Sequence, residues 1–239
     1  MPIIQHIGTA FASGAGQAES LDPFGDGSCK RFYPFNDSAT GNQDFSGNGY
    51  DFGSGSGESY TANGFVNGAW DGTGSNWMNN TNSNVVAYNN YSVSFWYKSN
   101  NTNQSNKRLV TTRAAGYTAG WSNYNGSLGF YKSGSSGYSQ SVSRQFDYPD
   151  SWVNNNVWHH LVYTMNGSTH LCYLDAVQSG GSGNTGDGRS FNSDGYLALC
   201  CYNNSTGYNT QGLVDNLRIF NKVLSGSEVS TLYALEGGT

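Results

Sequence analysis

Hydrophobic and polar residues alternate along several short stretches of the chain, and this pattern predicts β-strands. In the clearest stretch, 91–98, the large apolar residues Tyr91, Val93, Phe95 and Tyr97 share one face and the serines between them share the other. Clusters of Gly, Asn and Ser separate this stretch from similar ones. Strands are also predicted at 30–35, 64–70, 84–88, 107–113, 126–131, 139–146, 157–165, 168–175, 195–201 and 211–221. Roughly eleven such strands suit two packed antiparallel sheets.

One segment has a helical period instead. Ser225 and Glu228 form the sequence signature of a capping box, in which each side chain bonds the backbone N–H of the other residue. Apolar residues then follow at helical spacing, so we expect a short C-terminal helix that covers the last strand. The segments 75–84 and 179–188 are too polar for a core, and we expect them to be loops.

The length and composition favour one large all-β domain. The 239 residues suit a single domain, which we place at 28–239, with an N-terminal arm at 1–27 that is rich in small residues. Only 11% of residues are charged, whereas Gly contributes 33 residues and Asn 29, and both suit turns better than helices. Aromatic residues reach 15%, which supplies the apolar surface that a folded chain must bury.

Several classes of partner are not expected. The net charge is −5 and the 11 Lys and Arg residues form no basic stripe, so we do not expect nucleic acid as a partner. No run of 18 apolar residues occurs, and residues 1–20 lack the pattern of a secretion signal. The cysteines show no C-x-x-C spacing, so we expect reduced, mostly buried thiols at Cys29, Cys172, Cys200 and Cys201.

Three ordered motifs resemble a known family. They are WHHLVYT at 158–164, LCYLD at 171–175 and GLVDNLRIFNKVLS at 212–225. Together they resemble the laminin G-like, concanavalin A-like jelly roll, as do the turn at 44–49, the segment 65–70 and the strand at 93–98. The resemblance implies an all-β, two-sheet antiparallel jelly-roll sandwich with one short C-terminal helix. Ala176 departs from the family pattern, because it stands where the hairpin usually has Gly.

Catalysis is not expected. A glycoside hydrolase needs two carboxyl groups that flank the scissile bond, and the sequence contains no acid pair at a usable spacing. His159 and His160 are adjacent on a predicted strand and point to opposite faces, so they cannot bind one ion together. The sequence has four glutamates, at Glu19, Glu58, Glu228 and Glu236.

A calcium ion is the metal that the resemblance implies. The turn from 44 to 50 offers carboxylate, amide and backbone oxygens, which are the ligands that calcium prefers. By resemblance, one structural calcium would be bound by Asp44, Asn48 and Asp215. The alternative is that these residues hold their own loops through Asx-turn hydrogen bonds.

A glycan site is predicted in a loop at 116–125. It combines aromatic side chains with amides, the mixture that sugars require, and we assign Tyr117, Trp121, Asn123 and Tyr124 to the site. The alternative for each aromatic residue is that it closes one end of the sandwich.

These features lead us to expect a non-catalytic virion structural or surface protein: a head decoration, tail or fibre component. The jelly roll would serve assembly and attachment to cell-surface glycans on the host, and residues 1–27 would dock on other virion subunits in a homo-oligomer or larger assembly. The alternative is a bacterial extracellular carbohydrate-binding or adhesion module, which should be monomeric. A glycoside hydrolase is the least favoured option, because acidic residues are scarce.

Overall fold

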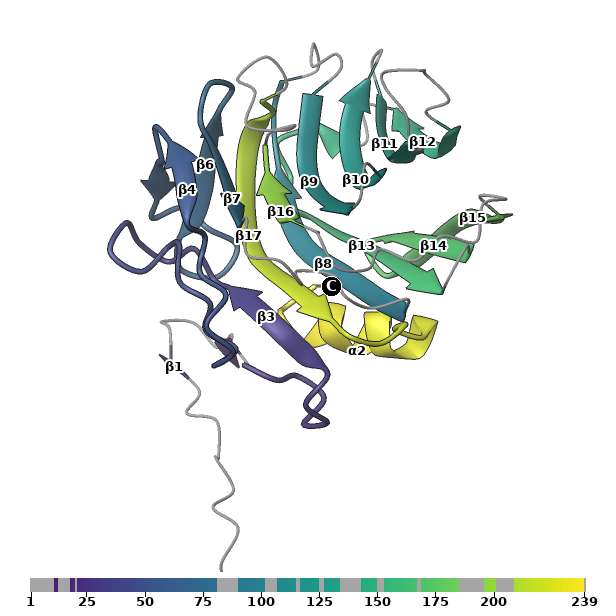
Figure 1. Ribbon diagram of the computed structural model, residues 1–239, viewed down its shortest axis with the longest axis horizontal. Coiled ribbons are helices and arrows are strands. Elements are labelled where there is room, and N and C mark those ends of the chain that lie inside the picture. The colour runs from purple at the N-terminus through teal and green to yellow at the C-terminus, as the bar shows by residue number, and fades with distance from the viewer. Residues whose placement is uncertain are drawn as a thin grey trace, which may run out of the picture.

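The protein is a two-sheet antiparallel sandwich with a short helix against its outer face (Figure 1). The computed structural model describes residues 11–12, 18–19, 21–80, 90–101, 107–114, 117–124, 127–133, 143–149, 153–166, 169–184, 196–200 and 209–238. The predicted fold class is confirmed. Within the described segments, no helix is long and apolar enough to cross a membrane.

Two sheets make up the sandwich, and we call them sheet I and sheet II. In spatial order, sheet I contains β15 (Val177–Asn184), β14 (Thr169–Leu174), β13 (His159–Asn166), β8 (Asn90–Lys98), β17 (Gln211–Phe220), β6 (Ala69–Thr73) and β5 (Tyr60–Thr61), and β3 (Cys29–Tyr33) also pairs with β17. Sheet II contains β12 (Ser143–Pro149), β11 (Ser127–Ser133), β10 (Tyr117–Tyr124), β9 (Lys107–Ala114), β16 (Tyr196–Leu199), β7 (Trp77–Asn80) and β4 (Ser54–Ser56). The short strands β1 (Phe11–Ala12) and β2 (Ala18–Glu19) pair with each other.

The alternation along β8 determines what lies between the sheets. Tyr91, Val93, Phe95 and Tyr97 are fully buried and pack against buried side chains of sheet II, among them Trp121. The residues between them point to the outer face of sheet I, since successive side chains on a strand project to opposite faces. The main core therefore contains the large residues that the sequence pattern placed on one face.

A second core lies on the outer face of sheet I. The helix α2 (Gly226–Leu235) begins after the N-cap Ser225, and both hydrogen bonds of the predicted capping box with Glu228 are present. Val229 and Leu232 are the buried residues of α2, and they pack against apolar residues of sheet I. The predicted cover for the last strand is thus confirmed.

A buried ionic cluster also holds the end of α2 against sheet I. The Glu236 carboxylate, 3% exposed, accepts hydrogen bonds from Trp96 Nε1 (2.6 Å) and from Arg218 Nη1. Arg218 is 1% exposed, and its guanidinium lies 3.9 Å from the centre of the Phe32 ring. His160 Nε2 lies 2.7 Å from Ser94 Oγ on the same face. Burial lowers the pKa of His160 to about 3.

The strand β17 changes partner along its length. Its first half pairs with β6 and its second half with β3, while β8 runs along its other side. The register with β8 shifts between Asp215 and Arg218, and Asn216 there has a φ of 48°. A bulge of this kind bends a strand and increases its twist, and it lies between the part of β17 that pairs with β6 and the part that pairs with β3.

Three predictions about local structure were wrong besides the loop predicted at 116–125, which contains β10. The polar segment 75–84 contains β7, whose Asn79 and Asn80 are buried, and the polar segment 179–188 begins within β15. The strand predicted at 64–70 starts only at Ala69. Hydrogen bonds explain how a polar residue such as Asn80 can be buried in β7: its Nδ2 donates to the carbonyls of Tyr50 and Asp51, each at 2.7 Å. The predicted strand at 84–88 lies outside the described residues.

The end of the predicted arm lies against the domain. Leu21 and Phe24 pack on the second core, with the Phe24 ring 5.6 Å from that of Phe220. Asp26 accepts a hydrogen bond of 2.5 Å from Lys222 Nζ, which lowers the pKa of Asp26 to about 2. Residues 21–27 are therefore in contact with the jelly roll. Before residue 21, the structure describes only the paired strands β1 and β2.

The described cysteines are buried in the sandwich. Cys29, Cys172 and Cys200 are buried thiols, as predicted. Burial raises the pKa of Cys29 to about 12 and also raises that of Cys172.

Asp175 and Ala176 connect β14 to β15 with φ values of 50° and 63°, so the hairpin keeps a left-handed turn although Ala replaces Gly.

Candidate functional site

A row of outward-facing residues crosses three neighbouring strands of sheet I. Asp71 on β6 lies opposite Leu213 on β17, and Leu213 lies opposite Lys98 on β8. All three side chains are half-buried. The next pair along the sheet, Asp215 and Trp96, is almost fully buried. The row therefore lies where the covering of the outer face ends.

Two glycines allow the strands to approach closely beside this row. A Cβ on Gly72 would lie 2.7 Å from the carbonyl oxygen of Gly212. Gly212 has a φ of 147°, and a Cβ there would lie 2.7 Å from Cε2 of the Tyr97 ring. Larger residues would force these strands apart, so backbone rather than side chain forms this part of the surface.

Hydrogen bonds fix the loop that follows β8. Ser99 Oγ donates to the Gln211 carbonyl (2.9 Å) and accepts from Asn101 N–H (3.1 Å). The Asn101 side chain donates to Gln211 Oε1, and Gln211 Nε2 donates to the Thr73 carbonyl (3.2 Å). Asn156 N–H donates to the Ser99 carbonyl (2.7 Å). Four separate segments thus meet at one place: the loop after β8, β17, β6 and the segment that contains Asn156.

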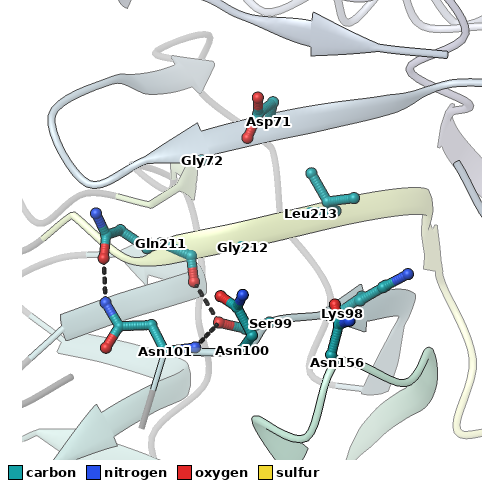
Figure 2. Close-up of a pocket in the computed structure, with 10 residues that line it drawn as sticks. All are labelled: Asp71, Gly72, Lys98, Ser99, Asn100, Asn101, Asn156, Gln211, Gly212 and Leu213. Carbon is teal, nitrogen blue, oxygen red and sulfur yellow. Dashed lines mark hydrogen bonds between the residues drawn. The ribbon is translucent and has the colours of Figure 1, made fainter. Parts of the chain in front are cut away.

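These residues enclose a hollow of about 300 Å³, which we call the polar hollow. Figure 2 shows Asn101 and Gln211 at one end and Lys98 and Asn156 at the other. The volume is at the lower end of the range for small-molecule sites. The polar hollow is lined by Asp71, Gly72, Lys98, Ser99, Asn100, Asn101, Asn156, Gln211, Gly212 and Leu213.

Part of this lining is available to a ligand. Within the described part of the chain, the side chains of Asp71, Lys98, Asn100 and Asn156 make no hydrogen bond or ion pair. Together they provide a carboxylate acceptor, an ammonium donor and two amides that both donate and accept. Asp71 is held by its backbone: its N–H donates to the Ser59 carbonyl (2.8 Å), and its carbonyl accepts from Asn76 Nδ2 (2.6 Å).

The predicted glycan residues lie elsewhere, on sheet II. Tyr117, Trp121, Asn123 and Tyr124 belong to β10, which pairs with β9 and β11, so the predicted loop is a strand. Trp121 is 0% exposed and packs in the main core, which is the alternative stated for it. A side chain in this position cannot stack on a sugar from solvent. The side chains of Tyr117, Asn123 and Tyr124 are not among the parts that the structure describes.

Hydrogen bonds occupy the carboxylate of Asp44, the first of the predicted calcium ligands. Asp44 Oδ1 accepts from the N–H groups of Phe32 (3.0 Å) and Ser46 (2.9 Å), and its Oδ2 accepts from Ser46 Oγ (2.9 Å) and Tyr50 N–H (3.1 Å). A carboxylate offers about four lone-pair sites, so these four donors use the capacity of Asp44. This arrangement is an Asx turn and does not fit a metal ion at Asp44.

The other two predicted calcium ligands also hold backbone or loop groups. Asn48 Nδ2 donates to the Lys30 carbonyl (3.0 Å). The buried Asp215 accepts from Val66 N–H (2.8 Å) and Asn216 N–H (2.6 Å). Asp215 thus secures the loop before β6, whereas Asp44 secures the turn after β3. Over the described residues, no group of three or more His, Cys, Asp or Glu side chains could hold a metal ion.

The two adjacent histidines have separate environments. His159 Nδ1 lies 2.7 Å from Asp175 Oδ2, whereas His160 contacts Ser94 in the buried cluster. Their side chains therefore do not converge on one ion, as the strand geometry predicted.

Sequence reasoning did not find the polar hollow. Asp71, Lys98 and Gln211 are far apart in the chain and belong to no common motif, and only the strand register brings them together. The alternation along 91–98 predicts that Lys98 points to the outer face of its strand. It does not predict which residues of other strands lie beside Lys98.

Comparisons with known families and structures place this geometry in context. Residues 71–230 match the laminin G family described as the concanavalin A-like lectin/glucanases superfamily. Comparison with curated protein sequences gives no significant match.

Solved structures share the fold at low sequence identity. Domain 4 of AbnA, an extracellular GH43 arabinanase from Geobacillus stearothermophilus, in complex with arabinotriose, is 19% identical with a TM-score of 0.66, over 86% of this chain and 98% of that domain. The binding domain of botulinum neurotoxin serotype D/C is 19% identical with a TM-score of 0.63, over 87% of this chain and 52% of that one. The serotype D ligand-binding domain in complex with N-acetylneuraminic acid is 22% identical with a TM-score of 0.59, over 87% and 51%. The chain therefore spans about half the length of these toxin domains.

Proposed function

Because the chain belongs to the concanavalin A-like lectin/glucanases superfamily, we propose that it is a non-catalytic carbohydrate-binding protein that binds its ligand in the polar hollow. The observation that carries this proposal is the set of lining side chains that make no hydrogen bond or ion pair in the described part of the chain: Asp71, Lys98, Asn100 and Asn156. Sugar hydroxyls both donate and accept hydrogen bonds, and this set offers both functions. Removing an amide from water costs less than removing an ion, so a lining dominated by amides suits an uncharged polar ligand.

The supply of carboxylates supports binding rather than hydrolysis. Glycoside hydrolysis requires two carboxyl groups about 5–10 Å apart, one on each side of the scissile bond. Asp71 is the only carboxylate that lines the polar hollow in the described structure. Glu236 and Glu228 are engaged with Arg218 and Lys222, and Glu58 is exposed and does not line it.

Two of the similar structures support the proposal, because they are complexes with arabinotriose and N-acetylneuraminic acid. The first is a domain of an arabinanase that covers nearly the whole fold seen here. Proteins with this fold can thus bind glycans. The similarity of these two structures to the present chain indicates by itself only a shared fold.

The setting of this binding is a separate part of the proposal. A virion surface remains the setting that we favour, on the basis of the charge content of 11%, because contacts between amides and apolar groups depend less on salt than ion pairs do. Light scattering on the purified chain tests this part. A symmetric oligomer would support an assembly component, and a monomer would favour an extracellular binding module.

The test of the function is a screen against a broad glycan panel, followed by titration of the strongest ligand into Asp71→Asn. This change keeps the size of the side chain and removes the charged acceptor, so we expect affinity to fall about tenfold or more. Glu58→Gln is the matched control, because it removes an exposed carboxylate outside the polar hollow. Failure of the folded wild type to bind any glycan, or equal affinity of Asp71→Asn and wild type, would overturn the proposal.

A further inference from the structure

An aromatic side chain continues the row that lines the polar hollow. Tyr97 on β8 lies opposite His159, the first residue of β13, so the same register sets Trp158 beside Lys98. Trp158 is half-buried, and the Lys98 ammonium lies over its ring, 6.0 Å from the ring centre. One face of the Trp158 ring is therefore turned toward a group that lines the polar hollow.

Phe65, which itself packs on Trp96, helps to fix the position of Trp158. The rings of Phe65 and Trp158 contact each other at a steep angle, with 6.1 Å between ring centres and 65° between ring planes, and Phe65 stacks on Trp96 at 3.5 Å. The loop that carries Phe65 is tied to sheet I by the bond from Val66 N–H to Asp215 (2.8 Å). A ring held in this way is pre-organised, so a ligand that stacks on it loses less conformational freedom on binding.

The row from Asp71 to Trp158 sets the length of the ligand. Asp71, Leu213, Lys98 and Trp158 lie on or directly beside four neighbouring strands. Three strand spacings of about 4.8 Å give a span of roughly 14 Å. A single sugar ring is far shorter than this span, so a monosaccharide cannot contact both Asp71 and Trp158.

We propose, building on the carbohydrate-binding function above, that the ligand is an uncharged oligosaccharide of two or three residues that lies across the strands. One residue occupies the polar hollow between Asp71 and Lys98, and a neighbouring residue stacks its apolar face on Trp158. The aromatic surface supplies apolar contact area, and the hollow supplies orientation through hydrogen bonds. The charges of Asp71 and Lys98 offset each other, so the site has no net attraction for an acidic sugar.

The test is a chain-length series measured by calorimetry, with linear arabino-, xylo- and cello-oligosaccharides from one to five residues as probes. For the series that binds, we expect affinity to rise up to two or three residues and then to stay constant. Trp158→Ala should lower trisaccharide affinity about tenfold and leave monosaccharide affinity within about twofold. Trp77→Ala is the control, because Trp77 is also half-buried but lies on β7 of sheet II.

Other outcomes separate this inference from the proposed function. If Asp71→Asn abolishes binding while Trp158→Ala changes nothing, the polar hollow binds sugar and the oligosaccharide inference is wrong. If no probe and no glycan of the panel binds, both are wrong. Should Trp158→Ala fail to fold, Trp158→Phe provides a second readout: the trisaccharide should change the tryptophan fluorescence of the wild type and not that of the variant. An equal change in both would overturn the inference.

Discussion

Removing the Glu236 carboxylate should destabilise the protein more than any surface change. Glu236 is 3% exposed and is the charged partner of Arg218, which is 1% exposed. Removing one member of a buried ion pair typically costs about 3–5 kcal/mol, because the other charge stays buried without compensation. For a chain of this length, we expect the melting temperature of Glu236→Ala to fall by roughly 6–20 °C.

A second variant separates the charge from the hydrogen bonds. Glu236→Gln retains an acceptor for Trp96 Nε1, which donates to the carboxylate at 2.6 Å, but leaves Arg218 without a counter-charge. If the charge dominates, Glu236→Gln should lose nearly as much stability as Glu236→Ala. The double variant Arg218→Met, Glu236→Gln should then lose less than the sum of the two single changes, since it buries no uncompensated charge.

The assay is denaturant unfolding followed by circular dichroism, with thermal melts in the same buffer. Glu58→Ala is the control, because Glu58 is exposed and the change should stay within about 0.5 kcal/mol of wild type. The reasoning is refuted if Glu236→Ala melts within 2 °C of the wild type, or if the single changes at 218 and 236 are additive.

Three further predictions concern the turn, the pH dependence and the thiols. Ala176→Gly should raise the free energy of unfolding by about 1 kcal/mol, because φ is 63° there, whereas Ala69→Gly in β6 should lower it; denaturant titration measures both signs. Burial lowers the pKa of His160 from 6.5 to about 3, so the unfolded chain binds a proton in this window that the folded chain does not. The contribution of His160 to stability should therefore be fully present above pH 6.5 and fall by about 1.4 kcal/mol per pH unit toward pH 3, and unfolding titrations of His160→Gln should lack this contribution. The native chain should react with DTNB at no more than one of its four cysteines at pH 8, and all four should react in denaturant; rapid native reaction of two or more would contradict the burial of Cys29, Cys172 and Cys200.

The alternation of residues predicted much of the fold because it records which face of a strand is buried. The strand at 91–98 and the capping box at Ser225 needed only local information, and both are present as β8 and α2. The prediction for the segment at 75–84 failed because the buried amide of Asn80 donates to carbonyls distant in sequence, those of Tyr50 and Asp51. Polarity alone cannot distinguish a solvated loop from a strand with paired amides.

The predicted sites depended on where side chains point, and this is where sequence reasoning was weakest. Trp121 was assigned to a sugar-binding loop because aromatic side chains and amides occur together at 116–125, yet it fills the core. Gly120, with a φ of 155°, explains part of the difference: a Cβ there would lie 2.2 Å from the Val110 carbonyl oxygen. This glycine permits close pairing of β10 with β9 and is not a loop signal.

The polar hollow occurs where the outer face of sheet I loses its cover. The helix α2 and the loop at 64–68 bury the row that contains Trp96 and Asp215, but the next row, with Lys98 and Leu213, remains half-buried. A sheet face in this position must present groups that tolerate water, and Asp71 and Lys98 meet that requirement while Leu213 keeps the row packed. The strand that carries the largest core residues therefore also carries Lys98 on its opposite face, so the packing that stabilises the sandwich also positions the proposed site. Substitutions that shift the register of β8 against β17 should then disturb stability and ligand binding together.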